Sequence, residues 1–204
     1  MRTLFIIFVG LMGLGMTIAA SAASFSSSFD VTLTKYAGLW YDTARTPNRF
    51  QDNTLSRDGK DFGPCINSTA NYTVTSPSSI DVLNRCTRKA ADGTLTEESI
   101  TGIALANNDP ENRKLKIAFG NSVARFFQRA FASRGGFDYW IYCLGPTNGN
   151  DLYDWAVVSG EDKSFIFILT RDQFISDDLK TEILACAKQA DLPVAELIYT
   201  QEKL

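Results

Sequence analysis

Eight short strand-like runs, separated by turn sequences, constrain what this chain of 204 residues can fold into. The runs are rich in β-branched and aromatic residues, which favour strands. Asp92-Gly93 is a strong hairpin signal between two of them, and Ser76-Pro77-Ser78 marks another turn. Many short strands in succession predict an all-β sandwich or barrel. The eight runs span residues 39–45, 68–75, 79–87, 95–105, 114–119, 139–144, 153–159 and 165–170.

One amphipathic helix is expected after the eighth run. Ser176 is a suitable N-cap, and Asp177 and Asp178 lie in the first turn, where the helix dipole favours negative charge. A short strand over 196–200 is expected to follow. Barrels of eight antiparallel strands leave an interior just wide enough for one small ligand, and their closure removes exposed sheet edges. The apolar residues that repeat at helical spacing are Leu179, Ile183, Leu184 and Ala187.

The N-terminus is typical of a secretory signal peptide. Arg2 precedes an apolar run over 4–18, and Ala20-Ser21-Ala22 supplies the small residues that a signal peptidase requires. We expect cleavage after Ala22 in preference to an uncleaved membrane anchor, because the apolar run is short. The protein is then secreted to the extracellular space or, in a bacterium, to the periplasm. The predicted organisation is a signal peptide over 1–22, a flexible Ser-rich leader over 23–32 and one folded domain over 33–204.

Composition argues against several function classes. The net charge is −3, which gives no basic footprint for nucleic acid. The chain has no His, and this removes Ser-His-Asp and Cys-His catalysis together with His metal sites. No metal and no cofactor is therefore expected.

A series of ordered motifs resembles one known family. Gly38-Leu39-Trp40 resembles the G-x-W signature of the first lipocalin strand, and residues 36–48 are similar to apolipoprotein D and the bacterial outer-membrane lipocalins. Six further segments match that branch in the right order, so the resemblance covers residues 33–200. These segments lie at 65–73, 82–84, 114–119, 139–141, 153–158 and 168–171.

The resemblance implies a fold and a function. The fold is all-β: an eight-stranded antiparallel up-and-down β-barrel (lipocalin) with a C-terminal α-helix packed outside and a short final strand. The function is to bind and carry a small hydrophobic ligand, such as a fatty acid, lysophospholipid, sterol or isoprenoid, without catalysis, in a monomer or weak dimer. The alternative is a lipocalin-fold enzyme of the isomerase or de-epoxidase type acting on a lipophilic substrate, for which Cys143 is the candidate thiol. A protease inhibitor or surface binder that uses its loops is a third class.

Trp40 and Arg171 are expected to close one end of the barrel. Trp40 begins the first strand and Arg171 ends the eighth, so in an up-and-down barrel they share an end. There the guanidinium can stack on the indole. Gly38 completes this family signature.

The ligand pocket is predicted from strand alternation and from the resemblance. Because Arg171 faces inward to cover Trp40, the alternating residues Leu169, Phe167 and Phe165 face inward too. No charge is expected deep in the pocket, which favours a ligand with an apolar body and one polar end. The residues that the resemblance places in the pocket are Tyr72, Asn84, Tyr139, Ile141, Ala156 and Val158.

Four Cys in an exported chain predict disulfides. Cys65 and Cys86 flank a predicted hairpin whose turn lies midway between them, which favours a Cys65–Cys86 bond. Cys143 and Cys186 then form the second pair, although family parity turns Cys143 into the barrel. The resemblance to apolipoprotein D supports a rival pairing, Cys65–Cys186.

Two long loops are expected at the open end of the barrel. The loop over 46–64 is a candidate lid. The loop over 120–136 combines Phe126, Phe127 and Phe131 with arginines, which suits either contact with a membrane surface or a short helix folded over the pocket.

Two N-glycosylation sequons begin at Asn67 and Asn71, and they matter only in a eukaryotic source. Asn71 alternates with the inward-facing Tyr72 and is the better exposed candidate.

Overall fold

The computed structural model describes residues 29–120 and 125–203, with side chains described from residue 129 onward in the second range. The expected signal peptide, its cleavage site after Ala22 and most of the expected leader lie outside these residues. Val31, near the end of that leader, packs with the domain: its side chain is buried, and its N–H donates to the carbonyl oxygen of Glu111. No helix in the described part of the chain has the length and apolar composition needed to cross a membrane.

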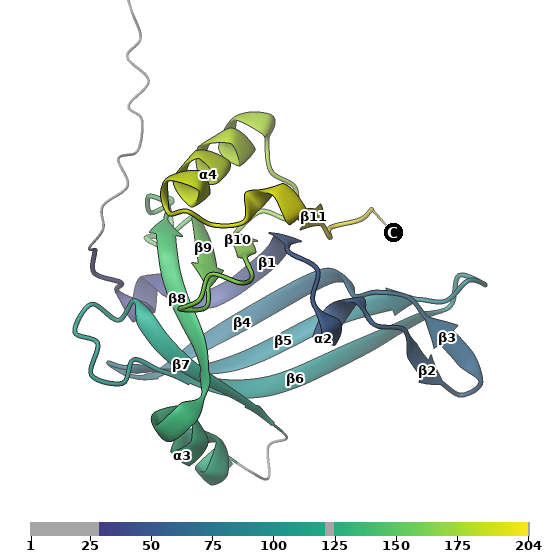
Figure 1. Cartoon of the computed structure of the whole chain (residues 1–204), viewed down its shortest axis with the longest axis horizontal. Coiled ribbons are helices and arrows are strands. Elements are labelled where there is room, and N and C mark those ends of the chain that lie inside the picture. The colour runs from purple at the N-terminus through teal and green to yellow at the C-terminus, as the bar shows by residue number, and fades with distance from the viewer. Residues whose placement is uncertain (1–28, 121–124, 204) are drawn as a thin grey trace, which may run out of the picture.

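The fold is an eight-stranded antiparallel barrel (Figure 1). The barrel closes because β10 (Phe167–Thr170) pairs with β1 (Gly38–Arg45). All eight predicted runs form strands, and the last two strands begin two residues later than predicted. The remaining strands of the barrel are β4 (Ile66–Ser76), β5 (Ser79–Lys89), β6 (Leu95–Leu105), β7 (Lys114–Gly120), β8 (Phe137–Leu144) and β9 (Trp155–Ser159).

Helix α4 (Asp177–Gln189) lies on the outside of the barrel, as predicted (Figure 1). It begins where expected because the side chain of Ser176 caps its first turn. The buried side chain of Ile183 packs with outward-facing residues of β9 and β10. After a 3₁₀ turn (Val194–Glu196), the predicted final strand forms as β11 (Ile198–Tyr199) and pairs with β1.

A four-residue helix, α1 (Leu33–Tyr36), precedes β1. Its buried side chains Leu33 and Tyr36 join the main interior cluster of the barrel. An isolated helix of this length is not stable by its own propensity, so its sequence carries no clear helical signal. Packing inside the end of the barrel holds it.

The segment over 46–64 contains more regular structure than an irregular loop. It holds α2 (Arg49–Asp52) and a hairpin of β2 (Leu55–Arg57) with β3 (Lys60–Phe62). The buried guanidinium of Arg88 anchors the segment to the barrel. It donates to the backbone carbonyl oxygens of Phe50, Gln51, Asn53 and Gly63.

Helix α3 (Arg125–Gly135) corrects one of the two expectations for the second open-end loop. A short helix does form, but it packs on the outer face of β6 and β7 and not over the pocket (Figure 1). Ala132 of α3 is fully buried against the outward-facing Ile103 and Leu105. These apolar residues on the outside of the sheet need cover, and α3 supplies it.

Candidate functional site

One end of the barrel is sealed by Arg171 and Trp40, as the family signature implies. The guanidinium carbon of Arg171 lies 3.5 Å from the centroid of the Trp40 ring. The same guanidinium donates to the carbonyl oxygens of Leu39 (2.6 Å) and Ala37 (2.9 Å). Burial lowers the pKa of Arg171 to about 10, so it stays charged at neutral pH.

Gly38 fits this closure because its φ of +90° lies in a region that favours glycine. A Cβ at this position would lie 3.5 Å from Nη1 of Arg171. The backbone at Gly38 therefore brings the start of β1 under the guanidinium.

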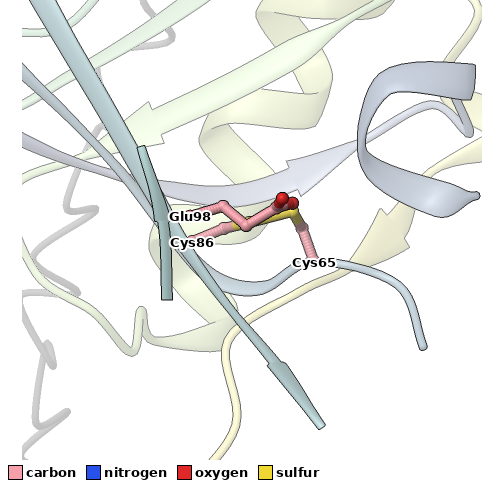
Figure 2. A group of neighbouring side chains, drawn as sticks. All are labelled: Cys65, Cys86 and Glu98. Atoms are coloured by element: carbon pink, nitrogen blue, oxygen red, sulfur yellow. A yellow bond between two sulfur atoms is a disulfide. The ribbon is translucent and has the colours of Figure 1, made fainter. Parts of the chain in front are cut away.

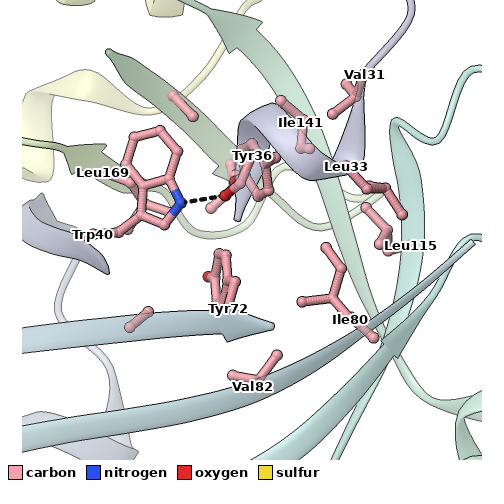
Figure 3. Close-up of a cluster of buried hydrophobic side chains, with 14 of the residues drawn as sticks. Val31, Leu33, Tyr36, Trp40, Tyr72, Ile80, Val82, Leu115, Ile141 and Leu169 are labelled. Carbon is pink, nitrogen blue, oxygen red and sulfur yellow. Dashed lines mark hydrogen bonds between the residues drawn. The ribbon is translucent and has the colours of Figure 1, made fainter. Parts of the chain in front are cut away.

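Three tyrosines form the polar floor above this seal: Tyr36 and Tyr72 are buried, and Tyr139 is partly buried. The hydroxyl of Tyr139 lies 2.7 Å from that of Tyr36 and 3.0 Å from that of Tyr72. Tyr36 also accepts a hydrogen bond at its carbonyl oxygen from the indole of Trp40 (2.8 Å; Figure 3). Burial raises the pKa of Tyr72 to about 12 and raises those of the other two well above their usual value. The three hydroxyls are therefore neutral and bond to one another.

Most of the residues predicted for the pocket lie together on the interior face. They join the interior cluster that Figure 3 shows in part. Asn84 pairs across the sheet with Ala70 of that cluster, so its side chain also faces the interior. Phe165 precedes β10 and contacts Phe167 edge to face, with ring centroids 5.7 Å apart. The predicted residues that the interior cluster contains or contacts are Tyr72, Tyr139, Ile141, Ala156, Val158, Phe167 and Leu169.

Three further apolar residues face the interior towards the open end and were not among those predicted. Phe137 pairs with Ile117 of the interior cluster, and the ring of Phe119 lies over Gly102, where a Cβ would approach it to 2.8 Å. Ile100 pairs with Asn84. Phe119 is 38% exposed and Phe137 60%, so this part of the interior face meets solvent. The alternation of Leu115, Ile117 and Phe119 in the sequence is the signal that would have found Phe119.

The interior also contains charges, which corrects the expectation that none lies deep in the pocket. Asp42 pairs with Leu169, a member of the interior cluster. Arg45 is fully buried and donates to Asp52 at 2.7 Å and to the carbonyl oxygen of Cys65. A β-bulge between Asp42 and Ala44 shifts the register, so both Asp42 and Arg45 face inward. Simple alternation from Trp40 misses Arg45 for this reason.

Burial raises the pKa of Asp42 to about 6. The nearby guanidinium of Arg45 and the hydrogen bond from Gln51 oppose this shift, and Asp52 adds to it. Asp42 is therefore mostly ionised at neutral pH and becomes protonated under mildly acidic conditions.

Both predicted disulfides are present, and the rival Cys65–Cys186 bond is not. Cys65 and Cys86 are joined with their Cα atoms 5.4 Å apart, beside Glu98 (Figure 2). Cys143 and Cys186 are joined at 6.2 Å. The inward orientation expected for Cys143 is wrong, because a bulge between Ile141 and Cys143 turns its side chain outward towards α4. A bonded Cys143 does not offer the nucleophilic thiol considered for an enzyme.

The two sequon asparagines differ in environment. Asn71 is exposed on the outer face of β4. Asn67 has a left-handed φ of 51°, and its side-chain oxygen accepts from the N–H of Glu202 at 2.7 Å. Asn71 is thus the more accessible of the two.

Comparison with known proteins agrees with this architecture. The Lipocalin-like domain family matches residues 31–202. Outer membrane lipoprotein Blc of Citrobacter freundii is 27% identical over 168 residues, which cover 82% of this chain and 77% of that protein. Temperature-induced lipocalin-1 of Arabidopsis thaliana is 23% identical over 168 residues, with 82% and 77% covered. Lobster apocrustacyanin A1 shares the fold, with a TM-score of 0.50 at 18% identity over 84% of this chain and 79% of that chain. The chain therefore belongs to the lipocalin family, with homologues in the branch of the bacterial outer-membrane lipocalins.

Proposed function

We propose that this lipocalin binds one small hydrophobic molecule inside its barrel and carries it, without catalysing a reaction. The observation that supports this most directly is the exposure of the inward-facing rings of Phe119 and Phe137 at the open end. An apolar face that remains wet in the free protein gains free energy when an apolar ligand covers it. The tyrosine floor and the Trp40–Arg171 seal close the lower end of the proposed binding site.

The proposed lining combines the predicted pocket residues with those that the structure adds. It is mostly apolar and aromatic, with a few polar groups, which is the usual composition of a small-molecule site. The proposed lining residues are Tyr72, Asn84, Ile100, Phe119, Phe137, Tyr139, Ile141, Ala156, Val158, Phe165, Phe167 and Leu169.

Ligand titration tests this proposal. Fatty acids, lysophospholipids, sterols and isoprenoids are added to the mature protein, and Trp fluorescence is followed because Trp40 is buried near the floor. Phe137→Ser should weaken binding about tenfold, since covering a Phe ring contributes about 1.5 kcal/mol or more. The matched control is Phe174→Ser, an exposed ring that follows β10 and contacts Lys203. A folded protein that binds none of these lipids, and that carries none when purified from its source and examined by native mass spectrometry, contradicts the carrier role.

The proposed carrier is secreted. Two disulfides suit an oxidising compartment, and we assign the signal peptide to 1–22, the leader to 23–32 and the domain to 33–204. N-terminal sequencing of secreted protein should begin at Ala23. In a eukaryotic host, Asn71 should carry the glycan, and Asn71→Gln should remove the corresponding mass while Asn67→Gln should not.

Helix α3 is the proposed contact with a membrane surface. Phe131 is 56% exposed, and Arg129 and Arg134 are exposed beside it. The side chains of Phe126 and Phe127 lie outside the described ones. Aromatics insert among lipid head groups while arginines meet anionic lipids. Sedimentation with phosphatidylserine vesicles should fall when all three Phe are changed to Ser, and unchanged sedimentation rejects the contact.

A further inference from the structure

An open cleft of about 500 Å³ lies at the rim of the barrel, between the start of β8 and the turn that joins β9 to β10. β9 ends at Ser159, opposite Trp140, so the first three residues of β8 extend beyond it (Figure 1). The volume of the cleft falls within the range of small-molecule sites. The residues that line it are 136–138, 160–162, Ser164 and Phe165.

Two aromatic rings connect this cleft to the interior of the barrel. Phe137 is 60% exposed although it lies on the interior face of β8, where it pairs with Ile117. Phe165 packs edge to face on Phe167, which contacts the interior cluster. A ligand whose apolar body covers these rings can therefore place its polar end in the cleft.

The deeper interior is already packed in the free protein. Ile141, Val158 and Leu169 are each at most 3% exposed. Val31 and Leu33, from the segment that precedes β1, join the same cluster and help to fill it. The apolar surface that a ligand can cover without displacing side chains thus lies at the rim.

The charged side chains that line the cleft are all acidic: Asp138, Glu161 and Asp162. Asp138 is paired with Lys116 at 2.6 Å. Neither Glu161 nor Asp162 has an ion-pair partner in the described part of the chain, and Oδ1 of Asp162 accepts from the N–H of Ser164, a neutral residue. Two carboxylates at the cleft therefore carry charge that no ion pair neutralises.

The basic side chains of this region face other surfaces. Lys163 lies between residues of the cleft, but its Nζ donates to the carbonyl oxygen of Ala190 at 2.8 Å, on the side of α4. A neighbouring hollow on the outer face of β7 and β8 borders the cleft at Asp138 and Glu161. That hollow contains the other basic residues, which are Lys114, Lys116 and Arg134.

Gly160 brings a carboxylate and an aromatic ring to the same point. A Cβ on Gly160 would lie 2.9 Å from Oδ1 of Asp162 and 3.0 Å from Cε1 of Phe165. Carboxylates attract cations directly, and aromatic rings attract them through the negative face of the ring.

The hydroxyl of Tyr142, which donates to the carbonyl oxygen of Gly160, reports the same negative potential. Burial raises its pKa, the carboxylates of Glu161, Asp162 and Asp138 raise it further, and Arg113 opposes them. The cleft therefore combines apolar surface with a surplus of negative charge.

We infer that this cleft binds the cationic head of an amphiphile, an ammonium or quaternary ammonium group, while the apolar body of the same ligand covers Phe137, Phe165 and Phe167. The inference rests on the proposed carrier function and narrows its ligands to apolar molecules that bear a positive charge. Exposed ion pairs and cation–π contacts are individually weak, so the carboxylates and the rings must act together.

Three probes of equal chain length test the inference on the full mature protein: dodecyltrimethylammonium, 1-dodecanol and dodecanoate, each below its aggregation concentration. We expect dodecyltrimethylammonium to bind about tenfold more tightly than dodecanoate, the sum of several weak contacts. This preference should shrink as the NaCl concentration rises, because salt screens exposed charges. Binding of 1-dodecanol should depend little on salt.

The double change Glu161→Gln and Asp162→Asn should remove most of the preference and leave the affinity for 1-dodecanol unchanged. Both side chains are exposed, and the amide at position 162 still accepts from Ser164. Gly160→Ala is a second test that keeps both charges: its added Cβ narrows the space between Asp162 and Phe165, so dodecyltrimethylammonium should bind more weakly.

Glu97→Gln combined with Glu182→Gln is the matched control. These carboxylates are exposed on β6 and α4, so the control removes the same two charges away from the cleft. Its ratio of dodecyltrimethylammonium affinity to dodecanoate affinity should equal that of the wild type.

The outcomes separate the two proposals. If 1-dodecanol binds but dodecyltrimethylammonium binds no more tightly than dodecanoate, the inference of a cationic head is overturned and the carrier function stands. A preference that the cleft variant retains in full overturns the inference in the same way. A folded protein that binds none of the three probes overturns both.

Discussion

The side chains of Asp42 and Arg45 face each other inside the barrel, with Nη1 of Arg45 3.4 Å from Oδ2 of Asp42. Both groups are buried, and the bulge between Asp42 and Ala44 is what brings them to the same face. The attraction within a buried ion pair is offset by the free-energy cost of removing both charges from water. The raised pKa of Asp42 shows that burial outweighs the attraction of Arg45 at this carboxylate.

Asp42→Asn should change how stability depends on pH. The pKa of Asp42 is about 6 in the folded protein and about 3.9 in an unfolded chain. A carboxyl whose pKa is raised stabilises the fold fully below the unfolded value, and this contribution is lost as pH rises through 6. A difference of about two pKa units between the folded and unfolded states corresponds to about 3 kcal/mol of unfolding free energy. As pH rises from 4 to 7, the wild type should therefore lose up to about 3 kcal/mol of unfolding free energy that Asp42→Asn does not lose. Urea unfolding of both proteins across this pH range measures the change in their difference.

Glu97→Gln serves as the comparison for that experiment, since it also replaces one carboxyl with an amide on the exterior. Its unfolding free energy should follow that of the wild type across the same pH range. If the unfolding free energies of Asp42→Asn and the wild type depend on pH in the same way, the pKa of Asp42 is not raised by folding.

Gly38→Ala should destabilise the closed end. The φ of +90° is strained for any residue with a Cβ. We expect a loss of roughly 1–3 kcal/mol, the range for a strained backbone position, measured by urea unfolding. Gly93→Ala, at a φ of +85° with nothing within 4 Å of the added Cβ, isolates the backbone strain. An equal loss of unfolding free energy in the two variants means that the contact between the added Cβ and Arg171 does not contribute to the destabilisation.

Removing the Cys143–Cys186 bond by a double change to Ala should cost about 4 kcal/mol in the chain-entropy description of a loop of this length. The bond spans 43 residues and ties β8 to α4. The Cys65–Cys86 bond spans 21 residues, so its removal should cost slightly less. Thermal unfolding of the two double variants measures which of them loses more stability. A larger loss for the variant without the Cys65–Cys86 bond would contradict the loop-length argument.

Arg88→Met should release the segment that carries α2 and the β2–β3 hairpin. The guanidinium of Arg88 donates to backbone carbonyl oxygens of this segment. A Met side chain retains much of the apolar volume of Arg but has no hydrogen-bond donor. Hydrogen exchange over residues 49–63 should become faster, while exchange in α4 stays unchanged. Arg49→Met, at an exposed position in the same segment, is the control.

The strands and the outer helix were predictable because their signals are local. β6 occupies the predicted residues, and the cap at Ser176 begins α4 where the sequence places it. The closing pair of Trp40 and Arg171 followed from strand order once the resemblance was recognised. These features depend on periodicity and chain order, which the sequence carries directly.

The missed features depend on tertiary context. The bulges after Asp42 and Ile141 shift the alternation by one residue, so Arg45 faces inward and Cys143 outward. The position of α3 depends on which outer face lacks cover, and α1 is too short to be predicted from propensity.

The pairing of β1 with β4, β10 and β11 joins the beginning of the domain to its end. Thr200 and Gln201 donate to the carbonyl oxygen of Asp42 across nearly the whole domain. A nascent chain therefore has β4 as a partner for its first strand early, but it lacks β10 and β11 until its last residues have been synthesised. Folding that waits for such distant contacts is slow, because a long loop must close before the contacts reward it. If the proposed signal peptide exports this chain, slow closure would leave it time to cross a membrane unfolded.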